Sequence, residues 1–394
     1  MSAAAARRLT PELEALLVCA QWVIDPAQTP RFRSALGRCA SPQLLCRTAI
    51  AHGMTGHLRA ALRTAPELQD TPLATTVAKV AASAARRGLR QSAVLLRLID
   101  KLAGSGIEAM PIKGPAWAEA LYGDVALRNW SDLDILVRYA DVPRARAILL
   151  DEGFHDASSF NERFLAREHR GQGELHFASA KPVHLDLHWE VGVAYRGRGL
   201  PAQHFLARSV PRILLQRPIL GPSAADLALL TCINGSRDRW NKIESLLALG
   251  VQIRDLPHDA WSDILAGARE VGCARRVVIG VTHVSRALGL DLPPAIAAAI
   301  AGDPVGRLLV CALSPDTLDT QSDDNGRREI ADLLWKFATE DSLWRTLENL
   351  GVRLLHPGLG EWQVVELRPS LHWLYFALRP LRLTVKWSRR LLIG

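Results

Sequence analysis

Two aspartates, Asp132 and Asp134, stand two residues apart at the start of an apolar run that ends at Val137. The run is rich in branched side chains and predicts a buried β-strand. Because side chains alternate along a strand, both carboxylates should point to the same face. Neighbouring carboxylates repel each other and are costly to bury unless a positive charge lies between them. Hard oxygen ligands favour Mg²⁺ or Mn²⁺, so the pair is a candidate metal site.

A third carboxylate, Asp186, lies in a second predicted strand, Val183 to Val191. The alternation there puts His184, Asp186 and His188 on one face and apolar residues on the other. Next to the first pair, Asp186 would complete an acidic triad able to hold two ions about 4 Å apart and to act at phosphorus. The alternative is that Asp186 lies on the solvent-exposed face of an edge strand and binds no metal. His188 is a candidate for contact with a substrate, unless both histidines only hydrogen-bond to the carboxylates.

A strand-to-helix turn at Lys113 and Gly114 precedes these strands. It joins a predicted strand, Ile107 to Ile112, to a predicted short helix, Pro115 to Leu121. Glycine lets a ligand approach the backbone, the helix N-terminus favours phosphate, and the lysine adds a positive charge. Arg128, shortly before the aspartate pair, is a second candidate for phosphate contact. The alternative for both cations is an ordinary surface charge.

The helices and strands expected around these residues indicate an α+β protein in three parts. Residues 1–104 should be helical, with a helix start at Thr10-Pro11 and a long helix from Ala74 to Ala103. Residues 105–192 alternate strands and helices, and residues 193–394 should be mainly helical. The helices expected in the last part are Ser223–Ile233, Trp240–Leu249, Ala260–Val271, Ala274–Leu288, Pro294–Ile300, Arg327–Phe337 and Ser342–Leu350, with a loop-rich stretch from Gly302 to Asn325.

The composition fits a globular protein of 394 residues, with 48% hydrophobic and 22% charged residues, and excludes disorder as the main state. The net charge of +8 is compatible with binding nucleotides, nucleic acid or an acidic membrane, without selecting among them. Six scattered cysteines without a CxxC pair predict small core residues, no structural zinc and a cytoplasmic location. We expect neither a signal peptide nor a transmembrane segment.

The C-terminal residues 367–394 contain six basic residues and no acidic one, interleaved with leucine and aromatic residues. This basic amphipathic pattern could lie on an anionic membrane or contact an acidic partner. It is equally typical of a terminal helix that docks on the body of the protein with its arginines in solvent, and this is the interpretation we favour from the sequence.

The order of these motifs resembles the bacterial proteins called the uncharacterised nucleotidyltransferase family, of the DNA polymerase β-type nucleotidyltransferase superfamily. The resemblance lies in KG at 113–114, LYGD at 121–124, R..SDLDILV at 128–137 and LDLHWE at 185–190. It implies a polymerase-β-like core, a mixed sheet with flanking helices, embedded in helical N- and C-terminal domains. It also implies Mg²⁺-dependent (or Mn²⁺-dependent) transfer of a nucleoside monophosphate from an NTP, with ATP expected, and release of pyrophosphate. The acceptor would be a hydroxyl or phosphate on a peptide, small metabolite, protein or tRNA.

The resemblance also implies roles. Asp132 and Asp134 match the carboxylates that hold the metal-bound NTP, and Asp186 matches the one that binds the catalytic metal and helps to activate the attacking hydroxyl. Gly114 matches the glycine of the phosphate-binding turn, and Arg128 would contact phosphate.

Two departures from the family pattern leave other functions open. Pro115 stands where superfamily members usually have a phosphate-binding serine, and residues 234–240 lack the expected histidines. A non-catalytic nucleotide-binding or scaffold protein with the same fold is therefore the main alternative. A metal-dependent phosphohydrolase is a third, although it would usually show more histidine ligands at defined spacing.

Overall fold

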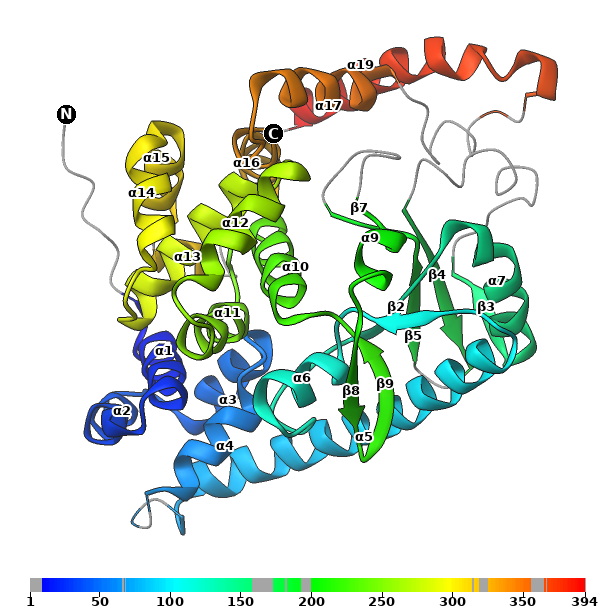
Figure 1. Cartoon of the computed structure of the whole chain (residues 1–394). Coiled ribbons are helices and arrows are strands. Elements are labelled where there is room, and N and C mark those ends of the chain that lie inside the picture. The colour runs from blue at the N-terminus through cyan, green and yellow to red at the C-terminus, as the bar shows by residue number, and fades with distance from the viewer. Residues whose placement is uncertain are drawn as a thin grey trace.

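The computed structural model describes residues 9–65, 67, 69–157, 173–180, 183–192, 200–313, 315–318, 325–355, 365 and 367–393. A five-stranded sheet lies beside a larger group of helices, and helix α5 runs along both (Figure 1). Each part has its own buried apolar cluster. This α+β arrangement confirms the predicted fold class.

The N-terminal helices begin where the sequence predicts. The Thr10 side chain accepts a hydrogen bond from the Leu13 amide, and Pro11 takes the first helical position. Thr71 caps the long helix α5 in the same way. The helices of this part are α1 (Pro11–Ile24), α2 (Thr29–Leu36), α3 (Pro42–Ala51), α4 (Thr55–Arg63) and α5 (Pro72–Gly104).

The central sheet is mixed, with strand order β1-β2-β5-β4-β3. Strand β2 pairs in parallel with β5, and the other neighbours are antiparallel. The sequence predicts a turn at Lys181-Pro182 before the strand that carries Asp186, but these two residues lie outside the described residues. The elements are β1 (Ala109–Pro111), α6 (Pro115–Tyr122), β2 (Asp132–Val137), α7 (Val142–Asp151), β3 (Phe154–Asp156), β4 (Glu174–Ser179) and β5 (His184–His188).

One face of the sheet is apolar and the other is polar, as the alternation along β2 and β5 predicts. Leu133, Ile135, Leu185 and Leu187 are fully buried in one cluster with residues of α5 and α7. The residues between them on each strand, which include the aspartates, therefore point away from α5. Helices α5 and α7 cover one side of the sheet and leave the polar side for the site (Figure 1).

A hairpin that the sequence does not predict follows the sheet. Strands β8 (Val210–Leu214) and β9 (Arg217–Gly221) pair antiparallel and contact α6 and β1. The turn residues Leu215 and Gln216 both have positive φ, 47° and 66°. Asn-Gly or Asp-Gly is the usual signal for such a turn, so this turn escapes recognition by sequence. Short elements β6 (Glu190–Val191), β7 (Leu200–Pro201) and α9 (Ala202–Leu206) precede it.

The C-terminal part is helical, with one element where loop was expected. The expectation of a loop-rich stretch from Gly302 to Asn325 is wrong for α15 (Pro304–Ala312), because Pro304 starts a new helix after a bend of 103° from α14. The other helices are α10 (Ala224–Arg237), α11 (Ile243–Asp255), α12 (Ala260–Glu270), α13 (Ala274–Leu288), α14 (Pro294–Gly302), α16 (Asn325–Ala338), α17 (Leu343–Leu355) and α19 (Leu374–Ile393).

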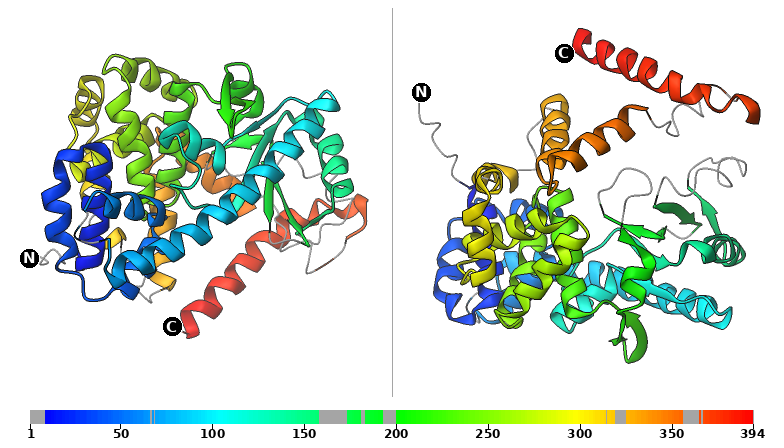
Figure 2. Two further views of the ribbon diagram at one scale, coloured as in Figure 1. Left: turned by 90° about the horizontal axis from the view of Figure 1, so that it is seen from below. Right: turned by 45° about the horizontal axis from the view of Figure 1, so that its top comes forward.

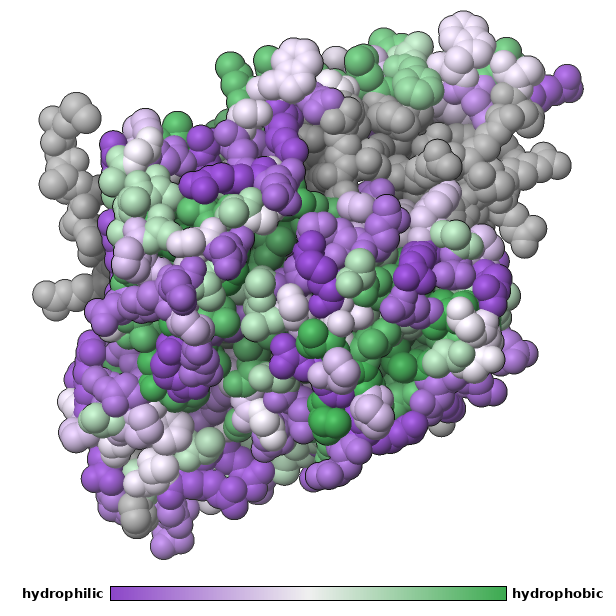
Figure 3. Space-filling model, in the orientation of Figure 1, coloured by the Kyte–Doolittle hydropathy of each residue, from purple (hydrophilic) through white to green (hydrophobic). Residues whose placement is uncertain are grey.

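Helices α17 and α19 pack against each other at the edge of the molecule (Figure 2). Hydrophobic residues are visible on the surface over this edge (Figure 3). None of the described helices is long and apolar enough to cross a membrane by itself. The bent pair α14–α15 meets the criteria of length and composition only when its two helices are combined.

Candidate active site

The polar face of the sheet gathers side chains from three adjacent strands. Asp134 on β2 is in register with Asp186 on β5, which is in register with His176 on β4. Two residues further along β5, His188 is in register with Glu174 on β4. The sheet therefore places three carboxylates and two histidines, with Asp186 in the middle, over a small area.

Asp134 is the most buried member, with 3% of its surface exposed. Its Oδ1 lies 2.8 Å from the Lys113 Nζ and 3.0 Å from the His188 Nε2. Its Oδ2 is buried and has no hydrogen-bond partner among the described residues. Burial alone would raise the pKa of this carboxyl, but the Lys113 ammonium and the hydrogen bond from His188 hold it well below its usual range. Asp134 is therefore ionised, with one oxygen left for a ligand.

Asp134, Asp186 and His188 form a group suited to a metal ion. Each offers one ligand atom, and these atoms all lie within 4.8 Å of one another. Asp132 is outside this group of three, and its Oδ1 instead accepts a hydrogen bond of 3.0 Å from the Ser131 hydroxyl. Two carboxylates and one imidazole are a donor set that divalent ions such as Mn²⁺ and Mg²⁺ accept, and the unpartnered Asp134 Oδ2 supports the fit.

Glu174 and His176 extend the cluster, although the sequence analysis did not select them. Glu174 Oε2 lies 3.1 Å from the His188 Nδ1, so His188 stands between two carboxylates. His176 Nδ1 lies 2.7 Å from the Asp186 Oδ1, and this hydrogen bond raises the pKa of His176. The alternation along β4 puts both side chains on one face of that strand, but it does not give the register with β5 that brings them to the cluster.

The turn at Lys113 and Gly114 joins this cluster to the start of α6. Gly114 has φ 62° and ψ −135°, a conformation that residues with a side chain rarely adopt. Pro115 follows at the start of α6, and both Lys113 and Gly114 line a pocket beside the cluster. Glycine is required here by the backbone conformation itself.

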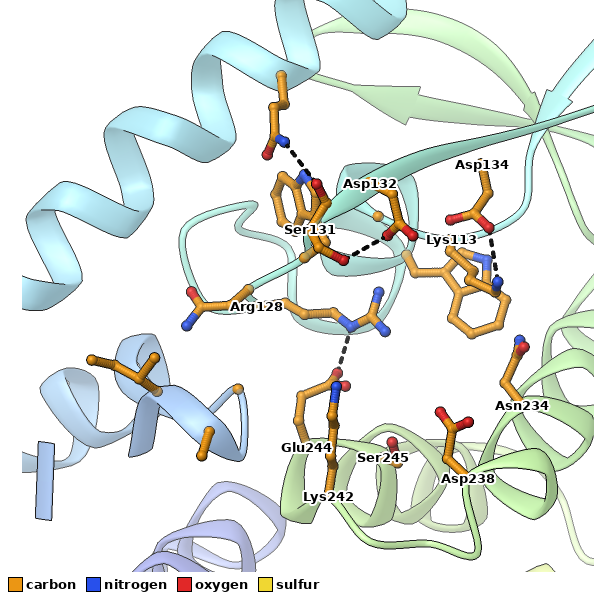
Figure 4. Close-up of a pocket in the computed structure, with 18 of the residues that line it drawn as sticks. Lys113, Arg128, Ser131, Asp132, Asp134, Asn234, Asp238, Lys242, Glu244 and Ser245 are labelled. Carbon is orange, nitrogen blue, oxygen red and sulfur yellow. Dashed lines mark hydrogen bonds and ion pairs between the residues drawn. The ribbon is translucent and has the colours of Figure 1, made fainter. Parts of the chain in front are cut away.

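A pocket of about 570 Å³ opens beside the cluster, between the start of β2 and the turn that joins α10 to α11 (Figure 4). Such a volume is typical of sites for small molecules and cofactors. On the sheet side, Lys113, Asp132 and Asp134 face the pocket. The lining cations are Arg87, Lys113, Arg128, Arg237 and Lys242. A pocket with this many cations beside carboxylates suits a polyphosphate accompanied by a metal ion.

Residues 39–289 match a protein-family model described as uncharacterised nucleotidyltransferase. The match covers more than half of the chain. The chain belongs to this family. The matched range contains every residue of the cluster and every residue that lines the pocket. No curated protein matches the chain by sequence.

Arg128 is anchored across the pocket. Its Nε lies 2.6 Å from the Glu244 Oε1 at the start of α11, and the Tyr122 hydroxyl lies 3.2 Å from the same oxygen. The guanidinium also lies over the Trp117 ring, 5.7 Å from its centroid. The Nη1 atom is buried without a hydrogen-bond partner among the described residues. Glu244 therefore fixes the arginine and leaves other N–H groups for a ligand.

The segment 234–240, which lacks the expected histidines, does reach the pocket. Asn234, Arg237 and Asp238 line it from the end of α10. Trp240 is fully buried instead, at φ 55°, and a Cβ on Gly235 or Gly280 would come within 2.4 Å of its ring. The two glycines therefore allow the indole ring to pack closely, and this packing holds the loop against the pocket wall.

Proposed function

We propose that this protein transfers a nucleoside monophosphate from an NTP to a hydroxyl or phosphate of an acceptor, and that the reaction depends on Mg²⁺ or Mn²⁺. ATP is the NTP that we expect. The observation that carries the proposal is the buried cluster of Asp134, Asp186 and His188 at the edge of a cation-lined pocket. A structural ion pair alone would need neither the adjoining cavity nor an unpartnered carboxylate oxygen.

The cluster would supply the metal ligands. Asp134, Asp186 and His188 would hold a divalent ion, with Asp132 at the start of the same strand available to share it. An ion bound there would neutralise charge on the phosphate oxygens and orient them for in-line displacement.

The remaining residues of the pocket would bind and position the substrates. Lys113 and the start of α6 at Gly114 would hold the phosphate chain, and Arg128, fixed by Glu244, would contact it from the other wall. The acceptor oxygen would attack the α-phosphorus, the bond to the bridging oxygen would break, and pyrophosphate would leave. Asp186, whose Oδ1 is hydrogen-bonded to His176, would take the acceptor proton.

The test is incubation of the protein with each α-labelled NTP and Mg²⁺ or Mn²⁺, with and without a cell extract as the source of acceptor. We expect a labelled product and released pyrophosphate, both lost in Asp134→Asn and in Asp186→Asn. Asp151→Asn is the matched control, because Asp151 is an exposed aspartate at the end of α7 and away from the pocket. Absence of transfer with every NTP would refute the enzymatic proposal.

The second candidate is a protein that binds nucleotide without transferring it. The Lys113–Asp134 ion pair favours this candidate, because the ammonium already neutralises the carboxylate that a metal ion would use. Equilibrium binding of a non-hydrolysable NTP analogue, without labelled product under any condition, is the result expected for it.

A further inference from the structure

Among its described side chains, helix α17 presents leucines and a tryptophan to solvent and two polar residues to the body of the protein. The exposed positions recur at helical spacing, and five of the six are leucines. They are Leu343, Trp344, Leu347, Leu350, Leu354 and Leu355. A helix of a globular protein normally buries such a stripe, so this one is arranged to meet a surface other than the body of the chain.

Two hydrogen bonds join α17 to the body of the protein. The Arg345 guanidinium donates to the Val271 carbonyl at 2.9 Å, and the Thr346 hydroxyl donates to the Phe337 carbonyl at 3.2 Å. These bonds hold the helix in the orientation that keeps its leucines outside. The exposure of Trp344, 74%, and of Leu343, 75%, is therefore fixed by the packing of α17 itself.

Helix α19 and the turn before it continue the same surface. The two helices pack against each other, and Leu371, Trp373, Phe376 and Leu381 are exposed, Trp373 by 64%. Hydrophobic atoms along this edge are visible in Figure 3, over the helices that stand apart in Figure 2. We call the exposed apolar residues of α17, the turn and α19 the apolar edge.

The positive charge of residues 367–393 indicates the kind of partner that the apolar edge would bind. Residues 367–393 contain six basic side chains and no acidic one. Leucine and tryptophan next to arginine and lysine suit the boundary between lipid headgroups and acyl chains, with the cations at anionic headgroups.

We propose that the apolar edge binds the surface of an anionic membrane, with α17 and α19 lying in the interface. This proposal revises the docked terminal helix favoured from the sequence, because the exposed face of α17 is visible only in the structure. It does not depend on nucleotidyl transfer, because the apolar edge is separate from the residues that line the pocket.

The test is vesicle flotation of the full chain. We expect binding to phosphatidylcholine vesicles with about 30% phosphatidylglycerol, at least about tenfold weaker binding to phosphatidylcholine alone, and a clear loss of binding in about 1 M NaCl. Trp344→Glu should reduce binding at least about tenfold. The matched control is Leu308→Glu on α15, because Leu308 is 72% exposed outside the apolar edge.

Each other outcome overturns the proposal. Absence of flotation with anionic vesicles, equal binding to both vesicle types, or equal effects of Trp344→Glu and Leu308→Glu would do so. Concentration-dependent dimerisation that Trp344→Glu abolishes, without vesicle binding, would identify a second copy of the chain as the partner instead. Thermal melting of both variants should match the parent protein because both side chains are exposed.

Discussion

Replacement of Lys113 by methionine tests how the candidate active site is held together. The Lys113 Nζ lies 2.8 Å from the Asp134 Oδ1, and the two side chains are 19% and 2% exposed. Removal of the ammonium leaves a buried carboxylate with the His188 Nε2 at 3.0 Å as its remaining partner. Methionine keeps the length and the apolar stem of lysine, so the change removes mainly the charge.

The expected cost follows from burial. Loss of one partner of a fully buried pair costs roughly 3–5 kcal/mol because the other charge is left uncompensated. Since Lys113 is partly exposed and His188 remains, we expect the free energy of unfolding to fall by about 2–3 kcal/mol at pH 7. The pKa of Asp134 is lowered in the folded state, so the contribution is present above the ordinary value of 3.8 and lost as the pH falls below it. The difference between the variant and the parent should shrink accordingly in acid.

The assay is urea unfolding in EDTA, followed by the same titration with Mn²⁺. The matched control is Lys101→Met, because Lys101 pairs with Glu152 at 3.2 Å but is 57% exposed, and we expect a change below about 1 kcal/mol. Because the lysine occupies one side of Asp134, Mn²⁺ should stabilise Lys113→Met more than the parent protein. Equal stability of Lys113→Met and the parent in EDTA, or equal stabilisation of both by Mn²⁺, would refute this reasoning.

Three further changes probe the frame of the site. Gly114→Ala places a side chain at φ 62° and should lower the free energy of unfolding, measured in urea, by about 1–3 kcal/mol. Gly104→Ala, which has open space around it, should not destabilise the protein. Equal effects of the two changes would contradict the backbone argument. Glu244→Gln removes the charge that pairs with Arg128 at 2.6 Å and should lower the free energy of unfolding by about 2–4 kcal/mol. It should also weaken binding of an NTP analogue. Unchanged binding would show that Arg128 does not contact the nucleotide. Burial lowers the pKa of His57 to about 3, so the unfolded chain gains a proton first as the pH falls from about 6.5, and stability should drop by up to about 1.4 kcal/mol per pH unit. His283, whose pKa burial also lowers, adds to the same slope, so His57→Phe should reduce the slope without abolishing it, and an unchanged slope would contradict the assignment to His57.

Local patterns were sufficient to predict most elements and part of the site. Alternation along two short strands predicts the face on which Asp134 and Asp186 lie, and their parallel pairing then puts them side by side. The start of α1 follows from the cap at Thr10 and the proline after it. These signals lie within a few residues of the feature that they predict, so a single sequence carries them.

Contacts between distant segments could not be predicted in this way. Arg128 and Glu244 are 116 residues apart, and no local pattern indicates that they meet. Glu174 enters the cluster through the antiparallel register of β4 with β5, which the composition of the strands does not specify. The same holds for the apolar edge, because helical spacing shows that α17 is amphipathic but not which face the body covers.

The continuous helix α5 limits how the pocket can open. It runs for 33 residues, roughly 50 Å at 1.5 Å per residue. It contacts α3 and α4 at one end and β1 and α7 at the other, while Arg87 and Gln91 from its middle line the pocket. A hinge between the N-terminal helices and the sheet would have to break this helix. Any widening or narrowing of the pocket would therefore come from movement of the opposite wall, the turn between α10 and α11, relative to α5.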